Sequence, residues 1–328
     1  MNEIRARVTS QEKEVYQIGS GAETKTAVVS GRYRYAVRTV SDYPAVGDYV
    51  TAQWPGDGSP AVITGLFPRK TCFIRKAAGS EKREQVVAAN VDTVFLCMSL
   101  NRNFNIRRLE RYLSIACESG AAPVVVLTKS DLCPDTEDRM AEARRAAPGV
   151  DVLAVSSLDG AYEALLPYLL PGKTVAFIGS SGVGKSTLIN RLIGADRLAA
   201  CETGSGDKGR HTTTRRELIE LPNGAFVMDT PGMRELGMWD SGSGIDAAFS
   251  DIEALARRCR YADCTHTTEP GCAVRAAAAA GALDAARLES YRKLKSENAY
   301  AADSSRYLEA KRAKFKEIAK INKQGRKK

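Results

Sequence analysis

KTVAFIGSSGVGKSTLINRLI, residues 173–193, joins an apolar run of strand length to a glycine-rich loop and a helical segment. The loop GSSGVGKS (179–186) matches G-x-x-x-x-G-K-[ST] at every required position. Glycines let the backbone N–H groups turn toward phosphate oxygens, and the helix N-terminus adds its positive end. The pattern predicts a phosphate-binding loop, with Lys185 on the β- and γ-phosphates and Ser186 on Mg²⁺. The expected phosphate contacts are Gly179, Ser180, Ser181, Gly182, Val183, Gly184, Lys185, Ser186 and Thr187.

A second motif, Asp229-Thr230-Pro231-Gly232, follows the apolar run AFVM (225–228). At the end of a strand the Asp229 carboxylate can hold Mg²⁺ through water, and the Gly232 N–H can approach a γ-phosphate where a side chain would not fit. D-x-x-G alone is also an ordinary turn. Its place after a strand and downstream of the phosphate loop favours the functional interpretation.

A third motif, TKSD (128–131), ends the apolar run PVVVL (123–127). In the pattern [NT]-K-x-D, the Asp131 carboxylate accepts two hydrogen bonds from a guanine ring, and the Lys129 methylenes cover the base. Adenine would leave that carboxylate unpaired and is therefore rejected. For the isolated tetrapeptide a capped surface turn is the favoured interpretation, and the phosphate loop on the same sheet is what favours base reading. The residues expected at the base are Thr128, Lys129, Ser130 and Asp131, with Ser156 and Ser157 at the end of the next strand.

Strands and helices alternate from residue 86 through the D-x-x-G motif, which predicts a parallel sheet covered on both faces. The three motifs occur in the order base loop, phosphate loop, D-x-x-G, whereas ordinary GTPases place the base loop last. A circularly permuted chain can build the same sheet, because the termini of a domain are often close in space. The stretch that follows D-x-x-G is then joined directly to the C-terminal helices, so that nucleotide state is expected to move them.

We expect three domains, at residues 1–74, 75–240 and 241–328. The first holds Val-, Tyr- and Thr-rich runs such as TAVVSGRYRYAVRTV (26–40) and predicts a small β-barrel. RKAAGSEKREQ (75–85) is a polar linker by composition, and the third domain is helical and alanine-rich. Residues 306–328 hold ten basic and two acidic residues, a net charge of +8, which suits nucleic-acid phosphates or a solvated helix.

Three cysteines and a histidine form the pattern C-x4-C-x-H-x5-C: Cys259, Cys264, His266 and Cys272. Three thiolates and an imidazole make a closed tetrahedral set for one structural Zn²⁺, which stabilises a small domain with little core. Free buried cysteines are the alternative. A redox role is disfavoured because the cluster contains no C-x-x-C.

The 328 residues are 44% hydrophobic and 27% charged, with a net charge of +9. This composition excludes collagen-like and mainly disordered chains. No apolar run reaches membrane-spanning length and the start has no secretory leader pattern. We therefore expect a cytoplasmic protein, without membrane partners and monomeric. The positive charge favours a polyanionic partner or solubility alone.

These motifs together resemble the family of ribosome small-subunit-dependent GTPases called RsgA or YjeQ. The resemblance extends over nearly the whole chain and includes the segments EQVVAANVD (84–92), TKSD, GSSGVGKST, GRHTTT (209–214), DTPGMREL (229–236) and CRYADCTHTTEPGC (259–272). It implies an OB-fold as the first domain. It also implies hydrolysis of GTP to GDP, stimulated by the small ribosomal subunit, during late maturation of that subunit and in contact with its rRNA.

Hydrolysis needs a group that orients the attacking water. Met233 stands after D-x-x-G, where many GTPases carry a glutamine, and a thioether cannot do this. His211 in GRHTTT is the nearest candidate, and the resemblance points to it as well. Thr213 or Thr214 would supply a second hydroxyl to Mg²⁺. A solvent-exposed loop histidine is the alternative for His211.

Two other functions remain open at this point. A P-loop kinase or ATPase would share the phosphate loop, although TKSD argues against adenine. An RNA-binding scaffold would use the nucleotide only as a structural ligand. GRYRY (31–35) could stack on RNA bases or pack a barrel core, and both interpretations fit its residues.

Overall fold

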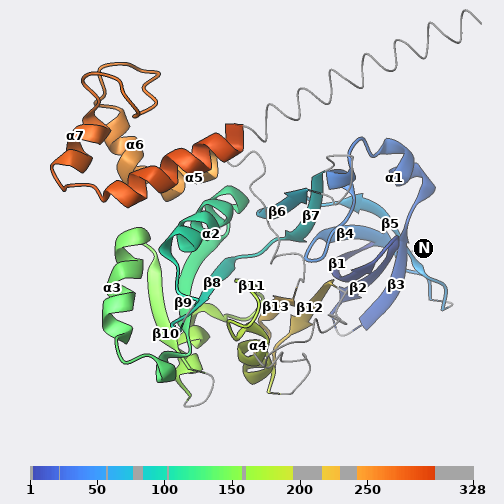
Figure 1. Ribbon diagram of the computed structural model, residues 1–328. Coiled ribbons are helices and arrows are strands. Elements are labelled where there is room, and N and C mark those ends of the chain that lie inside the picture. The colour runs from blue at the N-terminus through green and yellow to red at the C-terminus, as the bar shows by residue number, and fades with distance from the viewer. Residues whose placement is uncertain are drawn as a thin grey trace, which may run out of the picture.

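The computed structural model describes residues 3–21, 23–56, 58–76, 84–101, 103–156, 160–194, 216–229 and 242–299. Three regions follow one another along the chain. A β-barrel leads into a central α/β sheet, and a helical region packs beside helix α2 (Figure 1). The multidomain α/β fold expected from the sequence is confirmed. The domain limits at 74 and 240 stay a prediction.

The N-terminal barrel has five strands in the order β1-β2-β3-β5-β4, and β4 pairs again with β1 to close it. Its elements are β1 (Glu3–Glu12), β2 (Val15–Ser20), β3 (Glu23–Val29), α1 (Gly31–Ala36), η1 (Val40–Asp42), β4 (Tyr49–Gln53) and β5 (Ala61–Leu66). Strands β3 and β5 are parallel and the other pairs are antiparallel. Alternate residues such as Val8, Ile18 and Ile63 fill the interior. This is the OB-type barrel expected for the first domain.

The Val-, Tyr- and Thr-rich composition of residues 26–40 is typical of a strand, but the strand ends at Val29 and the prediction is wrong beyond it. Residues 31–36 form helix α1, because the Ser30 side chain accepts a hydrogen bond from the Tyr33 N–H at 3.1 Å and caps the turn. Tyr33 packs partly against the barrel core, whereas Tyr35 is 95% exposed. The two aromatic residues of GRYRY therefore have different surroundings, which alternation alone did not predict.

A two-stranded hairpin links the barrel to the central region. Its strands are β6 (Cys72–Lys76) and β7 (Glu84–Ala89). The polar segment expected as a linker therefore contributes both of its ends to a hairpin, and residues 77–83 lie outside the described residues. Phe73 and Val87 of the hairpin are buried in the same cluster as the central sheet.

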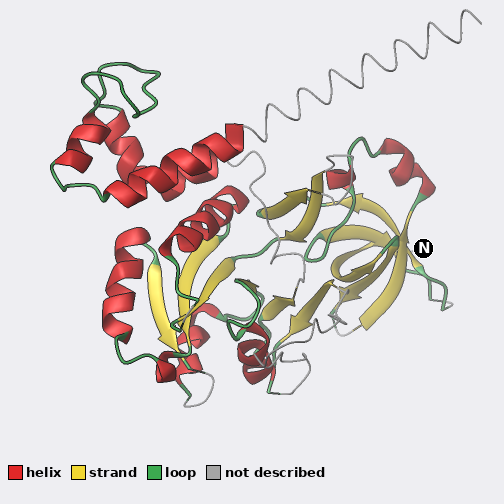
Figure 2. Cartoon of the chain, in the orientation of Figure 1, coloured by secondary structure: helices red, strands yellow, loops and turns green. Residues whose placement is uncertain are grey.

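The central sheet has the order β10-β9-β8-β11-β13-β12, with β12 antiparallel and the other strands parallel. Its elements are β8 (Thr93–Ser99), α2 (Ile106–Ser119), β9 (Ala122–Thr128), η2 (Ser130–Leu132), α3 (Thr136–Ala146), β10 (Asp151–Val155), η3 (Ala161–Tyr168), β11 (Thr174–Ile178), α4 (Lys185–Ile193), β12 (Arg216–Glu220) and β13 (Phe226–Asp229). The strands lie between helices (Figure 2). The strand that leads into the phosphate loop, β11, is central, with β8 and β13 as its neighbours.

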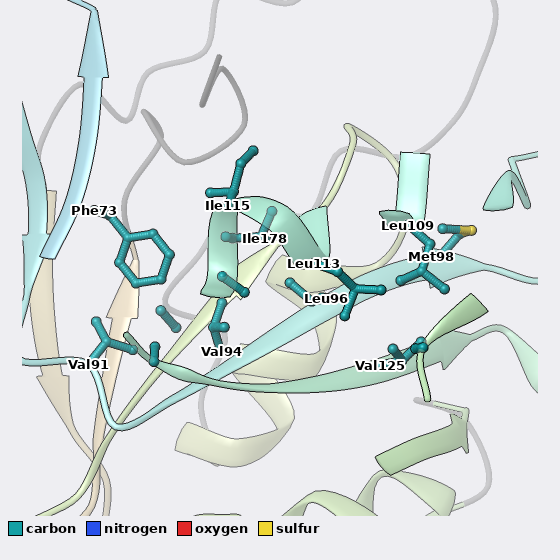
Figure 3. Close-up of a cluster of buried hydrophobic side chains, with 14 of the residues drawn as sticks. Phe73, Val91, Val94, Leu96, Met98, Leu109, Leu113, Ile115, Val125 and Ile178 are labelled. Atoms are coloured by element: carbon teal, nitrogen blue, oxygen red, sulfur yellow. The ribbon is translucent and has the colours of Figure 1, made fainter. Parts of the chain in front are cut away.

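Successive residues of the buried strands face opposite sides of the sheet and fill two cores. Val94, Leu96 and Met98 of β8 pack with Leu109 and Leu113 of α2 on one face (Figure 3). The residues between them belong to the second cluster, on the other face, with α4 and η3. Its strand members are Phe95 and Cys97 of β8, Val124 and Val126 of β9, and Val175 and Phe177 of β11. This alternation is the reason that the strands are apolar throughout.

The barrel and the central sheet share a strand pairing. β1 pairs antiparallel with β12, Ser10 opposite Glu217 and Gln11 opposite Arg216. The buried Arg7 of β1 reaches the first residue of β11, donating to the Thr174 hydroxyl at 2.5 Å. The eleven strands therefore form one continuous sheet.

The C-terminal region is helical, with α5 (Gly242–Ala248), α6 (Ser250–Ala256), α7 (Ala273–Ala279) and a further helix over 285–299. The helical run at 245–258 is divided into α5 and α6 at Phe249, which is buried. Residues 300–328, including the basic tail, lie outside the described residues. Within the described ranges, no helix has the length and apolarity that a membrane crossing requires.

The C-terminal helical region packs against helix α2 through close backbone contacts and a buried ion pair. A Cβ at Gly244 would lie 2.3 Å from the Ser114 carbonyl oxygen, so α5 approaches α2 at a glycine. The Glu118 carboxylate accepts from the Ser243 hydroxyl at 2.8 Å and the Gly244 N–H at 2.7 Å. Arg287 of the last helix reaches the buried Glu110 of α2 at 3.2 Å.

Candidate functional site

The phosphate loop connects β11 to α4 in the arrangement that the motif requires. Gly182 (φ 76°) and Gly184 (φ 96°) have left-handed backbone conformations that favour glycine. The Lys185 side chain is buried and its ammonium donates to the carbonyl oxygens of Gly179 and Ser180, each at 2.6 Å. Lys185 therefore lies within the concave loop, and the amides of the first turn of α4 are at the helix end where anions bind.

The base loop touches the phosphate loop. The buried Thr128 at the end of β9 donates from its hydroxyl to the Val183 carbonyl oxygen at 2.5 Å, across 55 residues of sequence. Lys129 follows in the left-handed region, at φ 61°, which is uncommon for a residue with a side chain. Asp131 lies in the short turn η2 and is exposed. The structure thus joins the two loops that the sequence places in reversed order.

The neighbouring strand ends lie at the same edge of the sheet. Val155, the last residue of β10, is paired with Thr128, so that Ser156 follows directly beside the base loop, and it is buried. β13 ends at Asp229 and runs parallel to β11, with Met228 beside Ala176. Several expected site residues are not among the described ones: Ser157, His211, Thr213, Thr214, Gly232 and the side chain of Asp229. Their roles stay predictions.

Two residues that the sequence analysis did not select also contact the phosphate loop. Asn103 donates from its side-chain amide to the Ser180 hydroxyl at 2.8 Å. Arg108, in the first turn of α2, donates to the same hydroxyl at 3.3 Å and to the Asn103 side-chain oxygen. The sequence does carry a signal for them, because the connection from β8 to α2 follows the carboxyl end of a parallel strand, where ligands bind in open α/β sheets.

The Cys/His motif forms a compact cluster far from the phosphate loop in sequence. The ligand atoms of Cys259, Cys264, His266 and Cys272 all lie within 4.8 Å of one another. The His266 Nδ1 is 3.6 Å from the Cys259 sulfur and 3.4 Å from the Cys272 sulfur, and the two sulfurs are 3.9 Å apart. A tetrahedral Zn²⁺ with ordinary bond lengths has S···S edges of ~3.8 Å and S···N edges of ~3.6 Å. The cluster therefore fits a four-coordinate metal.

The pKa shifts differ among the cluster's residues: burial raises the pKa of the Cys264 thiol to about 11, whereas the pKa values of Cys259 and His266 shift toward the metal-binding form. Burial opposes ionisation of Cys259, but hydrogen bonds from the Val274 and Ala273 amides lower the pKa of its thiol below the ordinary value. Burial lowers the pKa of His266, which favours the neutral imidazole. A metal ligand must be a thiolate or a neutral imidazole, so both shifts act in the right direction.

The Glu269 carboxylate stabilises the loop that contains His266. Its carboxylate accepts from the hydroxyl of Thr265 and from three amides, those of Thr265 at 2.8 Å, Thr267 at 2.9 Å and Thr268 at 3.0 Å. These donors hold the pKa of Glu269 well below its usual range. His266 itself has φ 60°, so the loop fixes an unfavourable backbone conformation at a ligand position.

The sheet order, the phosphate loop on its central strand and the base loop on β9 define a circularly permuted GTPase. Residues 66–239 match the model of the family described as RsgA GTPase. RsgA 2 of Lactiplantibacillus plantarum is 47% identical over 309 residues, covering 94% of this chain and 87% of that protein. RsgA of Opitutus terrae is 48% identical over 315 residues, covering 92% and 85%. The chain belongs to the RsgA GTPase family, and it is a hydrolase acting on GTP.

Two solved structures have the same fold. YjeQ from Thermotoga maritima superposes with a TM-score of 0.67 at 25% identity, covering 89% of this chain and 97% of that one. YloQ, described as a circularly permuted GTPase, superposes with a TM-score of 0.65 at 25% identity, covering 92% and 96%. The permuted architecture and the family resemblance seen in the motifs are thereby confirmed.

Proposed function

We propose that this GTPase acts on the small ribosomal subunit during late maturation, and that contact with the subunit accelerates its hydrolysis of GTP to GDP and phosphate. The relatives from Lactiplantibacillus plantarum and Opitutus terrae are named small ribosomal subunit biogenesis GTPases. From this partner we infer a cytoplasmic activity. The observation that carries the nucleotide part of the proposal is the Thr128–Val183 hydrogen bond, because it holds the base loop against the phosphate loop.

We assign roles along this joined site. Lys185 neutralises phosphate charge, and the amides around Gly182 and Gly184 donate to phosphate oxygens. Asp131 accepts from the guanine ring, and its exposed position leaves it accessible to a base. Ser156 and Ser157 supply the second base contact. Together these residues bind a guanine nucleotide from both ends.

The remaining catalytic roles are assigned from sequence position. Ser186 and Thr213 or Thr214 would hold Mg²⁺ by their hydroxyls, Asp229 would hold it through water, and Gly232 would donate its N–H to the γ-phosphate. Mg²⁺ neutralises charge on the transferred phosphate when bound. His211 would orient the attacking water, because Met233 offers no hydrogen-bonding group of comparable strength.

We assign one structural Zn²⁺ to Cys259, Cys264, His266 and Cys272. The near-tetrahedral separations and the lowered pKa of Cys259 support this assignment. The barrel and the basic tail at 306–328 supply rRNA contacts. In the barrel, the Arg5 guanidinium lies over the rings of Tyr49 and Phe67, at 4.3 Å and 5.0 Å, which leaves charge and aromatic surface together.

Turnover of GTP by the full chain with and without purified small subunits tests the partner. We expect slow basal turnover that the small subunit raises and the large subunit does not. Equal rates in both conditions would refute the role of the subunit and favour a scaffold.

Base specificity is tested at Asp131. The parent chain should bind GDP and reject ADP, and Asp131→Asn should exchange guanine for xanthine, since the amide donates where xanthine has an oxygen. Glu163→Gln, on η3, is the charge-matched control and should retain guanine preference. Equal binding of ADP and GDP by the parent would support the kinase or ATPase alternative instead.

A further inference from the structure

Arg108 is the arginine of helix α2 that faces the phosphate loop. Arg107 pairs with Glu110 at 2.8 Å and with Asp284 at 3.2 Å, and Arg111 pairs with Glu297 at 2.8 Å. The charges of these two arginines are therefore neutralised on the side of the C-terminal region. Among the described residues, Arg108 forms no ion pair with a carboxylate. Its guanidinium instead donates to two neutral oxygens, on Asn103 and Ser180.

Asn103 and Arg108 act on one residue of the phosphate loop. Asn103 donates to the Ser180 hydroxyl at 2.8 Å while Arg108 donates to it at 3.3 Å. The carbonyl oxygen of the same Ser180 accepts from the Lys185 ammonium at 2.6 Å. Ser180 thus connects two cations, of which Lys185 belongs to the motif and Arg108 comes from a distant segment of the chain.

The N-terminal cap of helix α2 holds the backbone of Arg108 in place. The Asn105 side chain accepts from the Arg108 N–H at 3.0 Å and caps α2, so that the first turn of the helix is well defined. Arg108 is half-buried, with reduced screening by solvent. A cation that pairs with no carboxylate of the described residues strengthens, in this position, the field of a loop that binds anions.

We propose that Arg108 is a positioning residue of the phosphate loop. With Asn103 it holds Ser180, and its charge strengthens the binding of the terminal phosphate. The proposal rests on the proposed binding of GTP at this loop. It predicts a larger effect on a triphosphate than on a diphosphate, because the terminal phosphate adds negative charge that only the triphosphate carries.

The test measures Kd of the full chain for GTP and GDP in Mg²⁺ by calorimetry, at low and high KCl. Arg108→Gln keeps a hydrogen-bonding side chain and removes the charge; we expect about tenfold weaker GTP binding and about threefold weaker GDP binding. Arg108→Lys should recover most of the GTP affinity. The loss should shrink at high salt, since charge interactions are screened. Asn103→Ala should weaken both nucleotides, since Ser180 and the guanidinium are then held less firmly.

Arg145→Gln is the matched control, an exposed arginine on α3 with the same change of charge, and should bind both nucleotides as the parent does. Equal losses for GTP and GDP, or an Arg108→Lys variant no better than Arg108→Gln, would overturn the role of charge. A melting temperature of Arg108→Gln within about 2 °C of the parent excludes general destabilisation. A parent that binds ATP as well as GTP contradicts the proposed function, and the Arg108 effect is then measured on ATP against ADP.

Discussion

Replacing Arg287 by Met should release the C-terminal helices from the GTPase region. Arg287 is 5% exposed and binds two carboxylates, Glu110 at 3.2 Å and Asp251 at 2.8 Å. It also donates to the carbonyl oxygens of Ala146 at 2.9 Å and Ala248 at 3.1 Å. One guanidinium therefore connects α2, the end of α3 and the junction of α5 with α6.

The magnitude follows from the burial of Glu110. This carboxylate is 1% exposed, and removal of one member of a buried ion pair costs about 3–5 kcal/mol because the other charge is left without its partner. Arg107 still donates to Glu110 at 2.8 and 2.9 Å, which places the expected cost near the lower limit, about 3 kcal/mol.

Hydrogen exchange of the amides in residues 285–299 measures this cost directly. A loss of about 3 kcal/mol in the local opening free energy accelerates exchange by about 100-fold. Arg139→Met is the control. Its partner Glu142 lies at 3.2 Å on an exposed helix face, and such pairs contribute about 0.5 kcal/mol or less. Exchange in 285–299 accelerated less than tenfold by Arg287→Met would refute the reasoning, because Arg287 would then not hold the interface.

Three further outcomes are expected. Cys264→Ser should lower the bound zinc measured by mass spectrometry from one per chain and reduce the helical circular dichroism, whereas Cys133→Ser should retain both; equal zinc content would contradict the assigned site. Burial raises the pKa of Asp251, but the Arg287 guanidinium lowers it, and this pKa stays below its ordinary value of 3.8. The ionised Asp251 therefore stabilises the fold fully above pH 3.8, and this stabilisation is lost as the pH falls below 3.8. Urea unfolding between pH 5 and 3 should show this fall in the parent and a smaller one in Asp251→Asn; identical slopes would be inconsistent with it. Burial raises the pKa of Cys97 to about 12, so iodoacetamide at pH 8 should modify it only in urea, as judged by peptide mass mapping; rapid modification of the native chain would show that the thiol is accessible.

Much of the central region was predictable because its determinants are local. The phosphate loop needs glycines at positions of positive φ and a lysine at the start of the helix. Gly182, Gly184 and Lys185 supply these residues within one short stretch of the chain. The Cys/His cluster is likewise contained in residues 259–272, a stretch short enough to bring its ligands together without help from other elements. The burial of β8 on both faces of the sheet followed from its continuous apolar character.

Local pattern failed where neighbouring elements decided the outcome. GRYRY has the residues of a strand, yet the Ser30 cap and the closing of the barrel make residues 31–36 a helix. The polar ends of the supposed linker pair with each other because Phe73 and Val87 are buried against the central core. Burial of these two side chains depends on residues distant in sequence.

The sequence by itself determined the phosphate loop, the base loop and the Cys/His cluster, because each is encoded in a few consecutive residues. The positions of these motifs along the chain established their permuted order. Only the tertiary structure decided that Asn103 and Arg108 contact Ser180, that Arg287 contacts α2, α3, α5 and α6, and that β1 extends the central sheet through β12. These contacts link residues far apart along the chain. Their formation depends on how the packed layers align, which no local pattern specifies.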